Sequence, residues 1–368
     1  MKDAPDYILL GLTIILVFLG MLILATVSAP FSLEKHGTTT YFLFHQIIYG
    51  LIPGIILGFA AFKLPLSFLK KNAFNFLLIN LFLLGLVFLP KIGLSSSGAA
   101  RWISCGGISF QPSESLKLFF ILYLAAWLAR PSFSKKNLGG QVHRSTFIPF
   151  LIIIGLISLF LIFQPDISTL GIITLIASIM YFSANTPILQ NVFILLAGIG
   201  SLILLIKIAP YRLNRLQVFL NPETDPLGIG YQMKQALIAI GSGGLLGKGL
   251  GMSRQKFGFL PQSIGDSIFA IFSEETGFIG SLILILVFLG FAWRGFKIAK
   301  SSNNIFLQLT ALGISCWIVI QGFINISSML KIFPLTGIPL PFISYGGSHL
   351  IAELIGVGIL LNISKQKY

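Results

Sequence analysis

Charge is scarce in this chain of 368 residues. Only 10% of the residues are charged, whereas a soluble domain carries roughly 25%. Hydrophobic residues make up 55% of the sequence, and the mean hydropathy is +0.92. A water-soluble core cannot bury this apolar excess. The composition therefore excludes an ordinary soluble protein and predicts one that lies in a lipid bilayer.

Cysteine and acidic residues are also few. Cys105 lies in a predicted loop and Cys316 in an apolar run, which predicts neither a disulfide nor a metal site. The 11 acidic residues stand against 25 Lys and Arg, which gives a net charge of +14. In a membrane protein such an excess reflects cytoplasmic loops and anionic headgroups. Membrane lipids are therefore expected partners, and nucleic acid is not.

Ten apolar segments approach the length of about 20 residues that a spanning helix needs. They cover approximately 7–28, 41–62, 74–90, 114–130, 147–163, 168–184, 188–207, 267–292, 305–327 and 338–362. No segment alternates as a barrel strand does, and backbone groups in lipid must be paired, so these segments are helices. The expected fold is an all-α polytopic membrane protein, with one integral membrane domain over 1–368.

The loop charges predict the orientation. With the N-terminus inside, 13 Lys and Arg fall in inside segments and 4 in short outside loops, so both termini are expected in the cytoplasm. A large external loop, about 208–266, separates the seventh and eighth segments and carries seven more basic residues, counted from Lys207. Loops of this length contribute little to orientation. We interpret their charge as functional, since each basic residue could meet an anionic group at the outer leaflet.

Polar groups concentrate between Gly241 and Phe278. The glycine run 241–251 permits close approach of a ligand, but it lacks the context of a nucleotide-binding loop. Asp266, at the entrance of the eighth segment, is either a helix cap or a functional acid. Glu274 follows eight residues later on a neighbouring helix face, so both could line one cavity. Hydrogen bonding between helices is the alternative for Glu274, and it is favoured for Glu275.

Two external turns carry further candidates. Gln111–Glu114 has the proline and acid of a helix start. Lys117, one turn later, either pairs locally with Glu114 or forms an anion pocket with Arg101 at the outer leaflet. Asp166, between the fifth and sixth segments, either caps a helix or belongs to an active site.

The stretch Phe333–Ser348 contains three prolines and three glycines, which predicts a broken or re-entrant segment. Such backbone is tolerated at membrane depth only inside protein or beside a cavity, so we expect it to close the cavity beneath the large loop. His349 and Glu353, four residues apart on the last segment, are expected to form a structural pair.

Eight stretches together resemble the SEDS family (shape, elongation, division and sporulation), the polytopic glycosyltransferases of bacterial cell-wall synthesis. These stretches keep the family order and cover essentially the whole chain. They are GAARWI (98–103), QPSESLKL (111–118), FQPDIST (163–169), YRLNRL (211–216), DPLGIGYQ (225–232), the 241–251 glycine run, LPQSIGDSIFAIFSEETGF (260–278) and PLTGIPLPFISYGGS (334–348). SRQK (253–256) and LLNIS (360–364) are most similar to the FtsW division branch.

The resemblance implies ten spans with both termini inside. It also implies polymerisation of lipid II at the outer face of the bacterial cytoplasmic membrane, at the division septum. A class B penicillin-binding protein and other division proteins are the implied partners. Asp266 takes the position of the family's essential acid, and Lys117 and Arg101 match its lysine and arginine. One departure concerns the common family residues Glu, His, Thr and Phe, which are replaced here by Gln262, Ile264, Gly265 and Ser267.

In the implied reaction, a sugar 4-hydroxyl attacks the anomeric carbon of a polyprenyl-diphosphate-linked sugar, with Asp266 as the catalytic base. Several residues are expected to bind substrate. The cations among them would stabilise the departing diphosphate: Arg101, Lys117, Arg212, Arg215, Lys248 and Arg254. The acidic residues expected to bind substrate are Glu114, Asp166 and Glu274. Mg²⁺ or Mn²⁺ is an optional addition, and no organic cofactor is expected. The alternatives are a transporter of the lipid-linked precursor and a non-catalytic division scaffold. The clustering of polar residues on the external side weighs against transport.

Overall fold

A computed structural model describes residues 4–96, 99–105, 108–130, 144–184, 186–208 and 210–366. Its α-helices are α1 (Tyr7–Val27), α2 (Ala29–His36), α3 (Tyr41–Gln46), α4 (Ile52–Lys63), α5 (Leu66–Leu86), α6 (Pro112–Leu128), α8 (Arg144–Phe163), α9 (Ile167–Ser183), α10 (Ile188–Ile208), α11 (Pro210–Leu220), α12 (Ile229–Gly243), α13 (Ile268–Ser301), α14 (Ile305–Met329) and α15 (Gly347–Lys365). A π-helix, η1 (Ile47–Leu51), joins α3 to α4, and a 3₁₀ turn, η2 (Pro222–Thr224), precedes α12. The strands are β1 (Gly93–Ser96), β2 (Ala99–Cys105) and β3 (Ile108–Phe110).

Each predicted apolar segment coincides with helix. Within the described part of the chain, six helices are long and apolar enough to cross a membrane: α1, the continuous run Tyr41–Lys63, α5, α13, α14 and α15. Shorter apolar helices occupy Phe147–Phe163, Ile167–Ser183 and Ile188–Ser201. The molecule is thus a mostly helical multi-pass membrane protein. Lys2, Lys135, Lys136 and Lys367, which enter the count of inside charges, lie outside the described residues.

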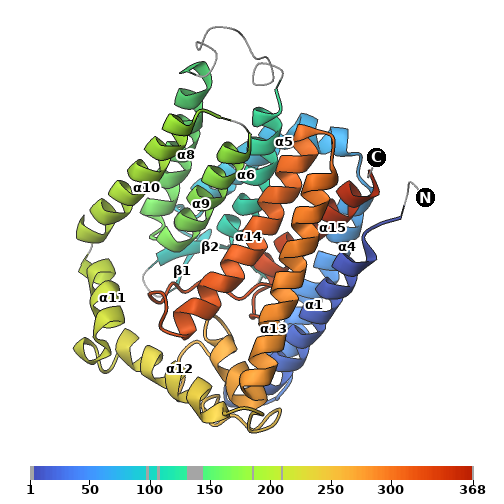
Figure 1. Cartoon of the computed structure of the whole chain (residues 1–368). Coiled ribbons are helices and arrows are strands. Elements are labelled where there is room, and N and C mark those ends of the chain that lie inside the picture. Colours follow the sequence, from blue (N-terminus) through green and yellow to red (C-terminus); the bar gives the residue numbers. More distant parts are fainter. Residues whose placement is uncertain are drawn as a thin grey trace.

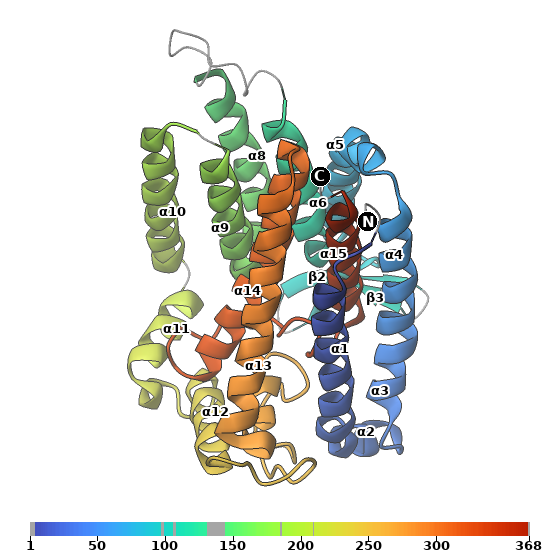
Figure 2. The same ribbon diagram turned by 45° about the vertical axis from the view of Figure 1, so that its right-hand side comes forward.

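The helices form one elongated bundle, with α8, α9 and α10 along one side and α1 and α4 along the other (Figures 1 and 2). The two chain ends lie close together, away from α12 and the loop that follows it (Figure 2). The N–H of Asp6 donates to Ser364 Oγ at 2.9 Å, and the Asp6 carboxylate pairs with Arg294 of α13. These contacts join the first, eighth and last predicted spans at one end of the bundle.

Small residues bring α4 and α15 into backbone contact. A Cβ added to Gly358 would lie 2.1 Å from the carbonyl oxygen of Gly58, and one added to Gly58 would lie 2.7 Å from that of Leu354. Glycine at helix interfaces permits this close approach, which supplies packing energy in a bilayer where the hydrophobic effect does not drive helices together.

The loop before α6 differs from the all-α prediction. β1, β2 and β3 form an antiparallel sheet in that order, with Ile103 paired to both Gly93 and Phe110. Polar sequence outside the apolar segments has no helical period to reveal its structure, and its backbone groups pair across strands instead. The sheet positions Arg101 and Trp102 beside the start of α6.

Candidate active site

α13 is broken at Gly277, which has φ 68° and ψ −164°. A break of this kind leaves backbone carbonyl and N–H groups without helical partners. The segment 244–249 supplies the missing partners. Lys248 and Gly249 donate their N–H groups to the carbonyls of Glu274 and Glu275 at 3.0 Å, and Gly244 and Leu245 accept from the N–H groups of Phe278 and Ile279 at 2.9 and 3.2 Å.

The glycine run makes this insertion possible. A Cβ on Gly247 would lie 2.2 Å from the carbonyl oxygen of Glu275, and one on Gly277 would lie 2.3 Å from the backbone nitrogen of Gly247. At Gly247 and Gly277 the close approach that the sequence predicted therefore occurs between two parts of the protein, rather than between backbone and ligand.

The glutamates just before the break hold the same loop. Glu274 accepts from Lys248 Nζ at 2.6 Å and from Ser253 Oγ at 2.5 Å. Glu275 accepts from Thr26 of α1 at 3.3 Å, which is the interhelical bond expected for it, and pairs with Lys256 at 3.5 Å. The structure therefore places Glu274 and Lys248 in mutual contact within the loop.

Asp266 lies in the turn that precedes α13. The N-cap position belongs to Ser267, so the alternative in which Asp266 caps this helix does not hold. Its carbonyl accepts from Asn325 Nδ2 at 2.8 Å, and the same amide group donates to the carbonyl of Ile338 at 2.8 Å. One buried side chain of α14 therefore ties the Asp266 turn to the segment before α15.

Two further bonds fix this turn from the same segment. Tyr345 donates its N–H to the carbonyl of Ile264 at 2.9 Å, and Ser344 Oγ donates to that of Gly265 at 2.8 Å. The backbone of both residues that replace the family's His and Thr is therefore engaged. Ser267 Oγ accepts from Gln232 Nε2 at 2.9 Å, so this third replacement makes a polar contact with α12.

The Asp266 carboxyl group is in an unusual environment. Its Oδ1 is buried and has no hydrogen-bond partner. Burial raises the pKa of Asp266 to about 6, because a charged carboxylate loses solvation there. Backbone hydrogen bonds, the charge of Arg215 and the amide of Gln232 lower this pKa without offsetting the burial. A carboxylate with this pKa is suited to accept a proton near neutral pH.

The segment between α14 and α15 is not helical, as predicted, and side chains of α15 bind its backbone. Phe342 has φ 64°, and its N–H donates to Glu353 Oε2 at 2.8 Å. The ring nitrogen Nε2 of His349 lies 3.0 Å from the carbonyl oxygen of Ser344. His349 and Glu353 are thus structural, although each contacts this segment in place of the mutual pair that was expected.

A polar pocket of about 150 Å³ lies beside this segment. Its lining comes from β2, the start of α6, the start of α9 and the segment before α15: Arg101, Trp102, Gln111, Glu114, Asp166, Thr169, Gly337, Ile338 and Pro339. Gly337 connects the pocket to the acid, because a Cβ on this residue would lie 3.8 Å from Asp266 Oδ2. The structure thus brings Arg101, Glu114 and Asp166 together next to Asp266.

The two cations expected to form an anion pocket are occupied by the protein. Lys117 is 1% exposed and donates to Glu114 at 2.8 Å and to Gln321 Oε1 at 2.7 Å. Arg101 donates through Nε to the carbonyl of Gln164 at 3.2 Å and through Nη2 to that of Pro165. The local pair of Lys117 with Glu114 is confirmed, and Lys117 does not line the pocket that contains Arg101.

The remaining candidates have separate environments. Arg215 of α11 donates to the carbonyl of Leu335 at 3.3 Å and acts on Asp266 through its charge, and Arg212 belongs to the same helix. The side chain of Arg254 is exposed. Asp166 caps α9 by accepting from the N–H of Thr169 at 3.3 Å, and it also lines the pocket. No group of three or more metal-binding side chains occurs within the described ranges.

Sequence reasoning missed Gln321 and Asn325, which fix Lys117 and Asp266 from α14. Both amide side chains are fully buried in an apolar helix. A polar residue inside a spanning segment is costly, and this was the signal that could have identified them.

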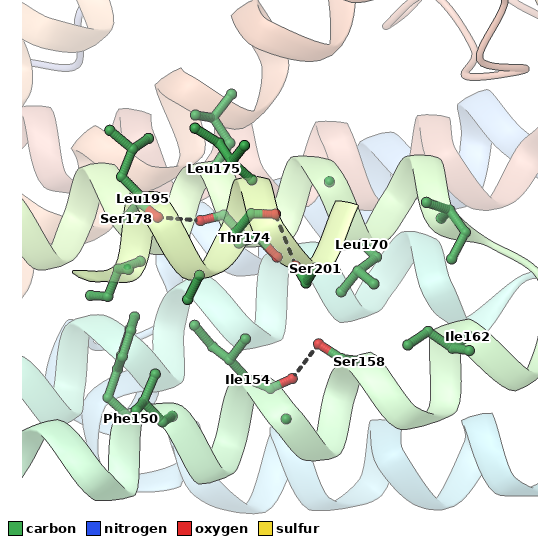
Figure 3. A pocket seen from close by; sticks show the side chains of 18 residues that line it. Phe150, Ile154, Ser158, Ile162, Leu170, Thr174, Leu175, Ser178, Leu195 and Ser201 are labelled. Atoms are coloured by element: carbon green, nitrogen blue, oxygen red, sulfur yellow. Dashed lines mark hydrogen bonds between the residues drawn. The ribbon is translucent and has the colours of Figure 1, made fainter. Parts of the chain in front are cut away.

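A second pocket, of about 460 Å³, lies among α8, α9 and α10 (Figure 3). Its surface is mainly apolar. The hydroxyls of Ser158 and Ser178 donate to the carbonyls of Ile154 and Thr174 in their own helices, at 2.7 and 2.8 Å. These groups are satisfied locally, so the pocket offers little to a polar ligand.

These features define a multi-pass membrane protein that keeps an acid-bearing polar pocket among its helices. The chain belongs to the FtsW, RodA and SpoVE family, described as cell cycle proteins, whose family model matches residues 7–368.

Two curated relatives span nearly the whole chain. Stage V sporulation protein E of Bacillus subtilis (strain 168) is 38% identical, over 99% of this chain and 98% of its own length. A probable peptidoglycan glycosyltransferase FtsW of Coxiella burnetii (strain RSA 493 / Nine Mile phase I) is 37% identical, over 96% and 94%.

Two solved structures share the fold. A chain from a peptidoglycan synthase complex, studied for the coordination of polymerization and crosslinking, has a TM-score of 0.77 and 26% identity, with 99% of both chains covered. The rod shape determining protein RodA of Thermus thermophilus has a TM-score of 0.71 and 25% identity, with 99% of this chain and 98% of that chain covered.

Proposed function

We propose that this chain is a peptidoglycan glycosyltransferase that polymerises lipid II into glycan strands during cell division. The observation that carries the proposal is Asp266, a half-buried residue whose Oδ1 is buried and unpartnered beside a polar pocket. Two independent elements, α14 and the segment before α15, hold its turn in place. The relatives named as probable peptidoglycan glycosyltransferases support the same activity.

In the proposed reaction, the 4-hydroxyl oxygen of the acceptor sugar forms a bond with the anomeric carbon of the donor sugar. The bond from that carbon to the diphosphate oxygen breaks, and its electron pair leaves with the polyprenyl diphosphate. The hydroxyl proton passes to the Asp266 carboxylate, which a pKa of about 6 leaves mostly ionised at pH 7. The carboxylate later releases this proton to water.

Developing negative charge on the diphosphate requires cations. Arg215 is the best placed, since its charge already acts on Asp266, and Arg212 lies one turn away on α11. Lys117 is paired with Glu114 and Gln321, so its proposed role is to fix the start of α6 against α14. Lys248 and Arg254 of the external loop remain candidates for more distant parts of the substrate.

No three metal-binding side chains gather among the described residues, so the proposal includes no metal held by protein side chains alone. In the proposal, Mg²⁺ or Mn²⁺ enters only as a counter-ion that the substrate diphosphate carries. Polymerisation in the presence of EDTA tests this part separately.

The proposal includes ten membrane spans with both termini in the cytoplasm, at the division septum. Helices at all ten predicted positions and the contact between Asp6 and Ser364 support this topology. Cysteine labelling of α12 from outside intact cells tests the placement of the large loop.

The proposed partners are a class B penicillin-binding protein and other division proteins. The likeness to a chain of a peptidoglycan synthase complex supports the first of these. Pull-down of candidate transpeptidases from division-stage membranes, followed by reconstitution, tests both.

The deciding experiment is polymerisation of labelled lipid II by the purified chain, with and without a penicillin-binding protein that has no transglycosylase of its own. Asp266→Asn is expected to reduce polymer formation about 10²- to 10⁴-fold. Asp225→Asn is the matched control, since Asp225 binds the N–H groups of Gly228 and Ile229 in the same external loop. Normal polymerisation by Asp266→Asn would refute the assignment.

The alternatives predict other outcomes. A transporter would move a non-polymerisable lipid II analogue across vesicle membranes in a manner that depends on Asp266. A scaffold would support growth after Asp266 substitution but not after loss of the whole chain.

A further inference from the structure

The polar pocket contains an acceptor group that the protein leaves unused. Asp166 is 5% exposed, and its Oδ1 accepts from the N–H of Thr169 at the start of α9. Its Oδ2 is buried and has no partner, although the residue lines the pocket. A buried carboxylate oxygen without a partner is costly, so a ligand that donates a hydrogen bond there would be bound favourably.

The charge balance of the pocket favours an uncharged ligand. Its lining holds two carboxylates, Glu114 and Asp166, and one cation, Arg101; Lys117 neutralises Glu114 from outside the lining, which leaves Arg101 and Asp166 as the remaining charges. Arg101 already donates to the carbonyls of Gln164 and Pro165. The lining therefore offers a surplus of acceptors, and a diphosphate would meet like charge from Asp166.

The size and shape of the pocket limit the ligand further. Its volume of about 150 Å³ is below the roughly 300 Å³ at which sites for drug-sized ligands begin, so one ring fits and an extended headgroup does not. Trp102 supplies an apolar face, and Gln111 supplies an amide group. Carboxylates and an aromatic ring together suit a compact molecule that has both hydroxyls and C–H faces.

The pocket and the basic residues contact different parts of one segment. Gly337, Ile338 and Pro339 line the pocket, whereas Arg215 binds the carbonyl of Leu335. A diphosphate near Arg215 and an uncharged ring in the pocket could therefore both lie next to Asp266.

We propose that this pocket is the subsite for the acceptor sugar, which donates hydroxyl hydrogen bonds to Asp166 Oδ2 and Glu114 while its ring packs on Trp102. This inference rests on the proposed function, because it assigns the acceptor to the pocket and the diphosphate to Arg215. Asp166 is here a binding residue that touches substrate, and Asp266 remains the base.

The test uses the full chain in detergent and N,N′-diacetylchitobiose as an uncharged probe. Saturation-transfer NMR is expected to detect binding to the unmodified protein and to Asp266→Asn. With Asp166→Asn, which keeps a good helix cap, affinity is expected to fall about 10- to 100-fold through loss of a charged hydrogen-bond acceptor. Asp225→Asn is expected to bind as the unmodified protein does.

A second measurement compares inhibition of lipid II polymerisation by the same disaccharide. Inhibition that Asp166→Asn weakens in parallel with binding would support the subsite. Polymerisation without any binding or inhibition by the disaccharide would overturn the subsite and leave the proposed function intact. Disaccharide binding that depends on Asp166, in a chain that makes no polymer, would support the subsite and contradict the proposed function.

Two further results would also overturn it. Pyrophosphate that displaces the disaccharide, and binds Asp166→Asn more tightly than the unmodified chain, would identify an anion site. Disaccharide binding that requires Mg²⁺ and disappears in EDTA would identify a metal site at Asp166.

Discussion

The pKa of Asp266 predicts how polymerisation depends on pH. If Asp266 is the base, the rate follows the fraction of molecules in which its carboxyl group is ionised. Burial raises this pKa from 3.8 to about 6, so the rate should decline as the pH falls through 6. An unperturbed aspartate would remain ionised over the same range and would predict no decline.

The size of the effect follows from the pKa. With a value of about 6, roughly 90% of the carboxyl groups are ionised at pH 7 and roughly 10% at pH 5. The initial rate at low lipid II concentration should therefore fall about tenfold between these two conditions. Arg215→Gln should move the midpoint to higher pH, because the guanidinium charge lowers the pKa of Asp266.

The assay measures initial polymerisation rates in buffers of constant ionic strength, with the partner protein bound throughout. Return of each sample to pH 7 before a second measurement controls for irreversible unfolding. A rate that stays constant between pH 5 and pH 7 would refute the raised pKa or the role of Asp266 as base. A midpoint that Arg215→Gln moves to lower pH would refute the electrostatic argument.

Two further predictions concern stability, measured by thermal unfolding in detergent. Gly247→Ala should lower the free energy of unfolding by about 2 to 4 kcal/mol, because its Cβ would meet the Glu275 carbonyl. Gly244→Ala is the control, because Gly244 also has a positive φ but has open space around it. An equal loss of stability in Gly244→Ala would contradict the insertion of the loop into α13. Asp266→Asn should raise the free energy of unfolding by about 1 to 3 kcal/mol above pH 6, because the folded carboxyl group is ionised there at a cost in solvation. Below about pH 4 the substitution should give no gain, because the carboxyl group is protonated. An unchanged free energy of unfolding at pH 8 would be evidence against burial of this charge.

Much of the fold could be predicted because lipid restricts the possibilities. Each apolar segment was expected to be helical, and each overlaps a helix, although the last, 338–362, is helical only from Gly347. The prolines and glycines of Phe333–Ser348 predicted the break before α15, and the start of α6 at Pro112 was also correct. These features depend on local sequence, which is why a single chain sufficed.

The errors concern contacts between distant residues. Lys117 was expected to meet an anionic ligand, but Gln321, 204 positions away, accepts from it. The glycine run was expected to permit close approach of a ligand, whereas part of it completes the backbone hydrogen bonds of α13. Such partners are set by tertiary packing, and neither periodicity nor spacing along the chain identifies them.

The candidate site was predicted in part. The family motifs contained Arg101, Glu114, Asp166 and Asp266, which the structure places around Gly337. The sequence could not show that Asp166 would keep one oxygen without a partner. That property depends on what surrounds the carboxyl group after folding.

The contacts that Asp6 makes with α13 and α15 have a consequence for biogenesis. Asp6 binds Arg294 of α13 and Ser364 of α15, so α1 meets the first partner 288 residues later in synthesis and the second 358 residues later. Until α13 is made, the Asp6 carboxylate lacks its ion-pair partner. Insertion of α1 into the bilayer therefore precedes formation of these contacts, and a nascent chain truncated before α13 should expose its N-terminal segment to protease.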